Sequence, residues 1–152
     1  MIDGHGRNID YLRISLIDRC NLRCVYCMPE DGVDMVPHEE ILTYEEVLRL
    51  VKVFAGLGFR KIKLTGGEPL VRQDLFEVMD FANKLGYHWG MTTNAMLINE
   101  SNIEKMKKTG MTTVSISLEG LEQSHDEFRG VKGSYSKIIE NIKKLKEANC
   151  LN

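Results

Sequence analysis

The chain has 152 residues, 43% of them hydrophobic and 28% charged, a composition that supports a folded core and argues against disorder. Lys and Arg number 20 against 22 Asp and Glu, and this balance argues against a general nucleic-acid-binding protein. No apolar stretch approaches the roughly 18 residues that a membrane-spanning helix needs. We therefore expect one domain, residues 1–152, with neither nucleic acid nor membrane as a partner.

The first half of the chain predicts alternating strands and helices. Residues 11–17 are rich in large and branched apolar side chains and predict a strand. Residues 43–55 predict a helix that begins at a Thr43 cap and carries apolar residues at helical spacing. A second strand over 61–65 and a second helix over 74–85, capped by Asp74, follow.

The second half repeats this alternation. Residues 87–92 predict a weaker third strand, and residues 101–109 a helix in which Ser101 and Glu104 form a capping box. A fourth strand over 113–118 precedes an amphipathic helix over 134–148. Four consecutive strand–helix units predict an α/β fold with a parallel sheet and helices outside it.

Polar and apolar residues alternate along the predicted strands, as in Arg13 against Ile14 and Lys63 against Leu64. Helices that cross over a parallel sheet bury its apolar side, so the polar side points the other way. In a closed or partly closed barrel that direction is the lumen, where we expect a wet binding cavity. The alternative is an open sheet with one solvated face.

The length of the chain limits how much of a barrel it can form. A complete barrel of eight strand–helix units needs about 250 residues, and four units supply half of that. We therefore expect a partial barrel, which would be explained if the chain is a fragment of a longer protein. A chain that ends here could instead associate with a second copy through its open sheet edge.

Three cysteines, Cys20, Cys24 and Cys27, follow the first strand directly, where barrel enzymes place their sites. Such clustering does not read as a disulfide framework and favours a reducing cytoplasm. Three thiolates in one loop can hold three irons of a [4Fe–4S] cluster and leave the fourth iron open to another ligand. Arg19 and Arg23 could offset the negative charge of such a cluster.

Other uses of the cysteines stay open at this point. A zinc site would need a fourth ligand, for which His38 is the nearest candidate. A redox pair of Cys24 and Cys27 would leave Cys20 unexplained. Cys150 stands alone and is interpreted as a small apolar residue.

The cysteine spacing, with aromatic Tyr26 inside it, resembles the signature of the radical S-adenosylmethionine (SAM) superfamily. The glycine-rich run over 65–69, after the second strand, resembles a second motif of that superfamily, and runs 92–94 and 115–119 follow in the right order. The resemblance implies a [4Fe–4S] cluster on Cys20, Cys24 and Cys27. It also implies SAM contacts from Tyr26, Gly66, Gly67, Glu68 and Ser117.

Runs 11–15, 18–21, 24–29 and 65–72 are similar, more narrowly, to the N-terminal half of the GTP 3′,8-cyclase family of molybdenum-cofactor biosynthesis. This resemblance implies reductive cleavage of SAM to a 5′-deoxyadenosyl radical, with electrons from a donor such as flavodoxin or ferredoxin. GTP would then face Arg13, Lys63 and Thr92. The family usually has arginine where Lys63 stands, so a bidentate contact would become a point charge.

Two further hypotheses remain. Residues 117–130 look more like radical SAM enzymes that modify peptides, which would change the substrate. A non-catalytic iron–sulfur or zinc module would fit a chain that lacks half of the barrel. The second cluster of the cyclase family has no counterpart here, so we expect the isolated chain to lack full cyclisation activity.

Overall fold

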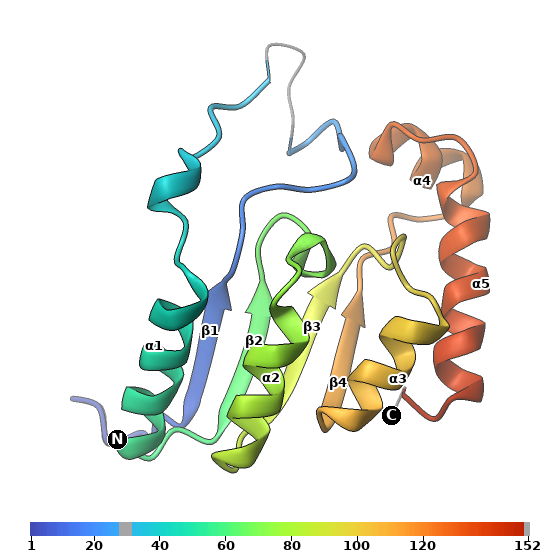
Figure 1. Cartoon of the computed structure of the whole chain (residues 1–152). Coiled ribbons are helices and arrows are strands. Elements are labelled where there is room, and N and C mark those ends of the chain that lie inside the picture. Colours follow the sequence, from blue (N-terminus) through green and yellow to red (C-terminus); the bar gives the residue numbers. More distant parts are fainter. Residues whose placement is uncertain (28–31, 151–152) are drawn as a thin grey trace.

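A computed structural model describes residues 1–27 and 32–150 of the chain. Met28 and Pro29, which end the cysteine motif, and the last two residues of the chain lie outside the described residues. One four-stranded parallel sheet carries helices α1, α2 and α3 on one face, and α4 and α5 lie beyond β4 (Figure 1). The predicted α/β class, with outer helices and a barrel that is not closed, is confirmed.

The strands follow the order of the chain, β1-β2-β3-β4, and every neighbouring pair is parallel. Within the described residues, β1 and β4 are the edges of the sheet. The register places Arg13 of β1 beside Lys63 of β2. The bounds are β1 (Tyr11–Ser15), β2 (Lys61–Thr65), β3 (His88–Thr93) and β4 (Met111–Ile116).

Most helices lie close to their predicted ranges, and one short α-helix, α4, was not predicted. The segment of α4 has few apolar residues, so helical spacing gave no signal there. The helices are α1 (Tyr44–Gly56), α2 (Leu75–Lys84), α3 (Glu100–Lys108), α4 (Glu122–Arg129) and α5 (Ser134–Glu147). Two short 3₁₀ helices, also not predicted, are η1 (His38–Glu40) and η2 (Pro69–Val71).

The predicted helix caps have three different outcomes. Thr43 caps α1 as predicted and forms a capping box with Glu46. The prediction of Ser101 as a cap is wrong, because α3 begins earlier and the side chain of Asn99 accepts the backbone N–H of Asn102 at 2.9 Å. Asp74 stands at the start of α2 but makes no capping bond, because both of its carboxylate oxygens accept from the Arg72 guanidinium.

The hydrophobic core fills the space between the sheet and the helices. Its central strand is β3, which the sequence analysis took as the weakest and which is in fact largely buried. Trp89 of this strand is fully buried, and its indole nitrogen donates to the carbonyl of Thr109 at 2.7 Å. Cys150 packs against the same core as a small apolar residue, as predicted.

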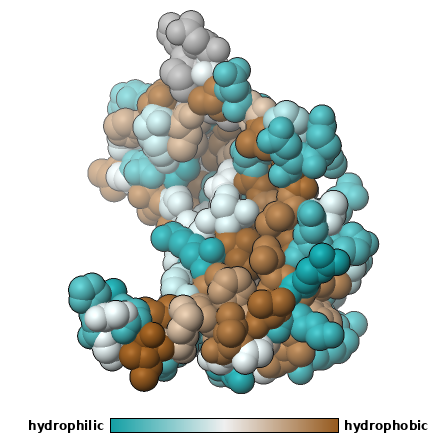
Figure 2. Space-filling view, turned by 90° about the vertical axis from the view of Figure 1, so that its left-hand side faces the viewer, coloured by the Kyte–Doolittle hydropathy of each residue, from teal (hydrophilic) through white to brown (hydrophobic). Residues whose placement is uncertain are grey.

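The opposite face of the sheet is polar and open. Arg13, Ser15 and Ser115 are exposed, and the Lys63 ammonium donates to the Ser115 hydroxyl at 2.8 Å across β3. Figure 2 shows this face as a pale and teal hollow between the upper loops and the N-terminal segment. In the part of the chain that the structure describes, no helix is long and apolar enough to cross a membrane.

Candidate functional site

A pocket of about 480 Å³ lies where the carboxyl ends of the four strands meet their loops. The structure brings together there most of the residues singled out from the sequence. Of the residues assigned from the sequence to the cluster, SAM or GTP, Lys63 and Glu68 do not line it. The lining includes Arg13, Cys20, Cys24, Tyr26, Cys27, Gly66, Gly67, Thr92, Asn94, Ser117 and Arg129.

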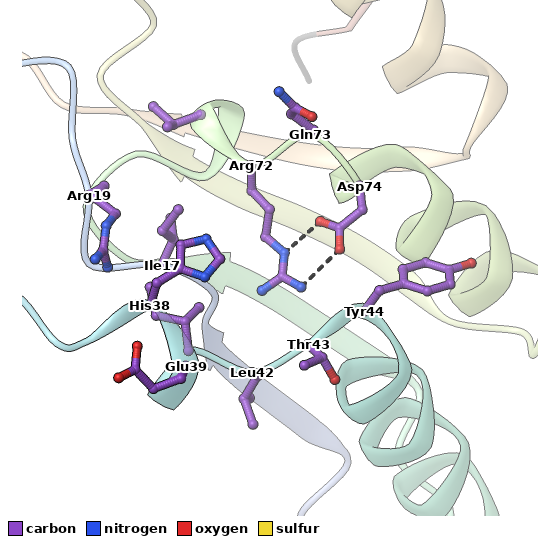
Figure 3. Close-up of a pocket in the computed structure, with 12 residues that line it drawn as sticks. Ile17, Arg19, His38, Glu39, Leu42, Thr43, Tyr44, Arg72, Gln73 and Asp74 are labelled. Atoms are coloured by element: carbon purple, nitrogen blue, oxygen red, sulfur yellow. Dashed lines mark hydrogen bonds and ion pairs between the residues drawn. The ribbon is translucent and has the colours of Figure 1, made fainter.

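A second pocket, of about 640 Å³, lies between the loop after β1 and the starts of α1 and α2 (Figure 3). His38, the candidate fourth zinc ligand, lines this second pocket and not the cysteine pocket. The Arg72–Asp74 ion pair occupies the middle of Figure 3, and no cysteine lines this pocket. The zinc interpretation therefore loses its proposed fourth ligand.

The cysteine loop, residues 20–27, presents three thiols that form no disulfide. Cys24 is buried and Cys27 is exposed, and the backbone N–H of Cys27 donates to the Cys24 carbonyl at 2.9 Å. Partial burial and the neighbouring Cys24 and Cys20 sulfurs raise the pKa of the Cys27 thiol. Across residues 1–27 and 32–150, no three potential ligand side chains are close enough to hold a metal ion. A cluster would therefore require this loop to draw its sulfurs together.

Gly66 and Gly67, here called the glycine turn, press directly against residues 17–19, the chain just before the cysteine loop. A Cβ on Gly66 would lie 2.3 Å from the Ile17 carbonyl oxygen, and one on Gly67 2.3 Å from that of Arg19. Gly67 also donates its backbone N–H to the Ile17 carbonyl at 2.7 Å. The fold itself thus requires glycine at both positions, whatever the turn contacts in the pocket.

Glu68 follows the glycine turn and is fully buried. Its carboxylate accepts from the backbone N–H of Leu70 at 3.1 Å, the Thr93 hydroxyl at 2.8 Å and the backbone N–H of Asn94 at 2.7 Å. Burial raises the pKa of this carboxyl group, and the three donors oppose that shift. Glu68 therefore holds the end of β3 in place from behind the pocket.

Asn94 links Glu68 to the cysteine loop. Its side-chain amide donates to the Cys20 sulfur at 3.5 Å and to the Asn21 side-chain oxygen at 2.9 Å. Glu68, Asn94 and Cys20 thus form a continuous chain of contacts from the loop after β2 to the pocket wall. Glu68 acts on the cysteine loop through Asn94.

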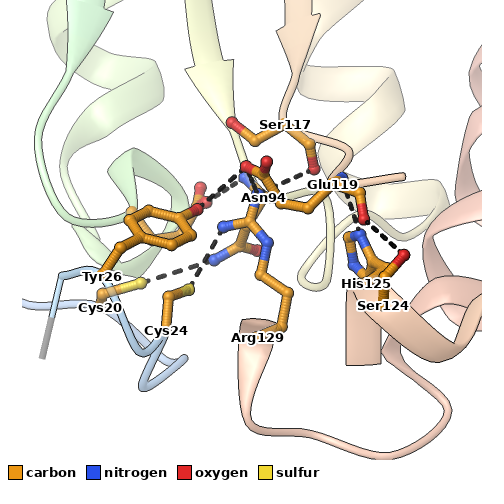
Figure 4. A network of polar contacts seen from close by, with 10 residues as sticks. Cys20, Cys24, Tyr26, Asn94, Ser117, Glu119, Ser124, His125 and Arg129 are labelled. Atoms are coloured by element: carbon orange, nitrogen blue, oxygen red, sulfur yellow. Dashed lines mark hydrogen bonds and ion pairs between the residues drawn. The ribbon is translucent and has the colours of Figure 1, made fainter. Parts of the chain in front are cut away.

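Arg129 is the functional candidate that the sequence analysis missed. Its side chain is only 6% exposed, and it donates from Nη1 to the Cys24 sulfur at 3.3 Å (Figure 4). Its Nη2 donates to the Ser117 carbonyl at 3.1 Å and to a Glu119 carboxylate oxygen at 3.2 Å. The same Glu119 oxygen accepts from the Tyr26 hydroxyl at 3.0 Å.

The basic residues chosen from the sequence are engaged elsewhere. Arg19 pairs with the Asp18 carboxylate and donates to the Val36 carbonyl at 2.9 Å. Arg23 donates to the backbone carbonyls of Cys20 and Leu22, each at 2.8 Å. Among the described hydrogen bonds, Arg129 supplies the one from a cationic side chain to a cysteine sulfur.

Helix α4 is fixed around Arg129 by two of its other residues. His125 is fully buried, and its Nδ1 accepts the backbone N–H of Glu119 at 3.1 Å. Burial and the nearby Arg129 charge lower the pKa of His125, which keeps this imidazole neutral. The Asp126 carboxylate accepts from the Ser134 hydroxyl and the Tyr135 backbone N–H, each at 2.8 Å, and so joins α4 to the start of α5.

Arg13 and Lys63 form a pair of cations on the open face of the sheet. They are neighbours in register across β1 and β2, and partial burial and the Arg13 charge lower the pKa of Lys63. Neither pairs with a carboxylate among the described residues. Two cations side by side without a carboxylate partner favour an anionic ligand. Such a ligand could reach the pocket, because Arg13 lines it together with Thr92.

The sequence model of the radical SAM superfamily matches residues 14–152. The chain belongs to this superfamily. Its members use a [4Fe–4S] cluster and SAM. The donor set of the pocket fits such a cluster, because three unpaired thiols share one wall and buried N–H donors from Asn94 and Arg129 point at two of their sulfurs.

Curated relatives narrow the similarity. A GTP 3′,8-cyclase of Clostridium botulinum is 43% identical over 148 residues, which are 95% of this chain and 46% of that protein. A GTP 3′,8-cyclase of Thermodesulfovibrio yellowstonii is 42% identical over 97% of this chain and 47% of its own length. The chain thus spans about half the length of the curated relatives it matches.

Solved structures show the same fold. The anSMEcpe structure with bound AdoMet (SAM) has a TM-score of 0.75 at 23% identity and covers 93% of this chain and 41% of its own. SuiB of Streptococcus suis has a TM-score of 0.72 at 24% identity, over 92% of this chain and 31% of SuiB. SuiB bound to the precursor peptide SuiA has a TM-score of 0.66 at 26% identity, over 91% of this chain and 30% of that one.

Proposed function

We propose that residues 1–152 are the cluster-binding and SAM-binding part of a GTP 3′,8-cyclase, the N-terminal part of its radical SAM core. The observation that carries the proposal is the 43% identity to the C. botulinum cyclase along nearly the whole chain, together with the three free cysteines at one pocket. The reaction class would be reductive cleavage of SAM followed by hydrogen abstraction from GTP.

The residues of the pocket would divide into three groups. Cys20, Cys24 and Cys27 would hold the cluster, whose chemistry when bound is to supply one electron for cleavage of SAM. The residues proposed to bind and orient SAM are Tyr26, Gly66, Gly67 and Ser117, all of which line the pocket. Glu68 would support the same site from behind, through Asn94.

GTP would lie over the polar face of the sheet. Arg13 and Lys63 would attract its triphosphate, and Thr92 would contact it where β3 reaches the pocket. Lys63 would act as a point charge and not as a bidentate fork. We further propose an electron donor such as flavodoxin or ferredoxin, a cytoplasmic location, and pairing of an open sheet edge with more of the barrel or with a second copy.

Anaerobic reconstitution with iron and sulfide tests the cluster. We expect about four irons per chain and a cluster spectrum that changes when SAM is added. Single Cys→Ser variants at positions 20, 24 and 27 should lose most of the bound iron, whereas Cys150→Ser, which alters a cysteine outside the pocket, should retain it. Equal iron in all four variants, or about one zinc and no iron, would contradict the proposal.

A second candidate is a radical SAM enzyme that acts on a peptide. It is favoured by the likeness to SuiB in its complex with a precursor peptide and by the segment from Glu119 to Gly130. Equilibrium binding separates the two candidates. GTP binding that falls about tenfold in Arg13→Gln supports the cyclase, and failure of a protein with the complete barrel to bind GTP favours the peptide substrate.

A further inference from the structure

Arg129 is a buried cation whose contacts span three separate parts of the chain. It reaches Cys24 in the loop after β1, and Ser117 and Glu119 in the loop after β4, while its own backbone ends α4. Its guanidinium carbon also lies 5.9 Å from the centre of the Tyr26 ring. A guanidinium group stays protonated in proteins, so Arg129 is a cation although its side chain is buried.

The two charged side chains near the Cys24 sulfur, Arg129 and Glu119, differ in how far they are exposed to water. The Arg129 side chain is 6% exposed, while the Glu119 side chain that partly neutralises it is 38% exposed. Water therefore screens Glu119 more than it screens Arg129, and the balance at the buried sulfur is positive. Other groups that feel the Arg129 charge are the Tyr26 ring and the Ser117 carbonyl, which favour a cation, the Cys27 thiol, the His125 imidazole and the buried Glu68 carboxyl group. The Glu68 carboxylate is already engaged by three hydrogen-bond donors of its own.

We propose that Arg129 is a positioning residue that raises the reduction potential of the cluster proposed at Cys20, Cys24 and Cys27. Its N–H group donates to the Cys24 sulfur, and its buried positive charge favours the cluster state that carries the extra electron. Hydrogen bonds to cluster sulfurs and the local charge are among the features that set such potentials. The proposal rests on the proposed cluster and adds a residue that neither cysteine spacing nor the glycine turn identifies.

The test is a redox titration of the reconstituted protein, followed by electron paramagnetic resonance of the reduced cluster. In Arg129→Gln we expect the ratio of reduced to oxidised cluster at a fixed potential to fall about tenfold, a shift of about 59 mV for one electron. Lys132→Gln is the matched control, because it removes the same charge from an exposed residue three positions further along. It should leave the midpoint potential unchanged.

Two further variants separate the charge from a purely structural role. Arg129→Lys keeps the charge and loses the fork, and it should restore most of the shift. Glu119→Gln keeps an oxygen acceptor for Tyr26 and Arg129 but removes the negative charge, and it should move the potential the opposite way by less than tenfold in the ratio. If Arg129→Gln does not fold, these two variants carry the test.

The results separate this proposal from the proposed function. Equal midpoint potentials in the wild-type protein, Arg129→Gln and Glu119→Gln would overturn the role of Arg129 and leave the cluster itself standing. Shifts of the same sign in Arg129→Gln and Glu119→Gln would also overturn it, because opposite charges must act oppositely. A wild-type protein that binds no cluster would instead overturn the proposed function, and this inference with it.

Discussion

The helix-covered face of the sheet and the loops at its carboxyl end are stabilised in different ways. Under the helices, apolar side chains such as Trp89, Val47 and Met79 fill one continuous core. At the carboxyl end, polar contacts join segments far apart in the chain, and Arg129 reaches a cysteine 105 positions away. The core depends on how much apolar surface is buried, whereas the loops depend on particular pairs of atoms.

The core should show the largest loss of stability when one side chain is truncated. In Trp89→Ala we expect the free energy of unfolding to fall by about 3–5 kcal/mol, because a fully buried indole leaves a cavity and an unpaired Thr109 carbonyl. Urea denaturation measures the change. Leu121→Ala, at a residue that is 78% exposed, is the control and should stay within about 0.5 kcal/mol. Equal losses of unfolding free energy in both variants would show that burial in the core does not decide the loss.

A substitution in the glycine turn should reduce stability less than Trp89→Ala does, but it should damage the site more. In Gly67→Ala the added Cβ would meet the Arg19 carbonyl oxygen at 2.3 Å, so the turn or the cysteine loop must shift. We expect a loss of about 1–3 kcal/mol in the free energy of unfolding, with most of the reconstituted iron lost. Gly56→Ala, where a Cβ meets no atom within 4 Å, is the control and should keep its iron. Full iron loading in Gly67→Ala would show that the contact is not needed.

The smallest loss of stability is expected from a substitution of Asp126, where α4 meets α5, and this loss should depend on pH. Hydrogen bonds from the Tyr135 and Gly133 backbone N–H groups lower the pKa of Asp126. The carboxylate therefore stabilises the fold above its unfolded pKa of about 4, and this stabilisation is lost as the pH falls through the lower folded pKa. Asp126→Asn should be less stable than the wild type at pH 7.

Urea denaturation of both proteins at several pH values measures this difference. It should narrow as the pH falls below about 4, because the wild-type carboxyl group then becomes protonated and loses its acceptor charge. A difference that stays constant from pH 7 down to pH 3 would show that charge has no part in the contact.

The sequence predicted the fold where local patterns decide it. The spacing of Val47 and Val51, both fully buried, is a local property of one helix, and so is the Thr43 cap. The alternation along β1 and β2 likewise placed Arg13 on the open face. The prediction failed where a competing local partner exists, as with Asn99, which caps α3 in place of Ser101. It also failed for α4, whose few apolar residues leave no helical period to detect.

The site was predicted in its components but not in its connections. The cysteine motif and the glycine run identified Cys20, Cys24, Cys27, Gly66 and Gly67, and the structure places all five at one pocket. Their specific roles toward cluster and SAM stay predictions.

Contacts between distant segments supplied what the sequence analysis lacked. Arg19 and Arg23, close in the chain, turn to the Asp18 carboxylate and to backbone carbonyls, whereas the donor to Cys24 comes from α4. No pattern in a single sequence records such a long-range pair. Basic residues close to the cysteines in the sequence were therefore a poor guide to which cation lies beside their sulfurs.

The close fit of the glycine turn against the chain that leads into the cysteines has a practical consequence for engineering. A designer who grafts residues 20–27 onto another scaffold would transfer the three cysteines without the backbone that supports their loop. The smallest transplantable unit would include the stretch that begins at Ile17 and the turn at Gly66 and Gly67, about fifty positions after Ile17. Side-chain-free backbone is thus as much a component of this site as its thiols.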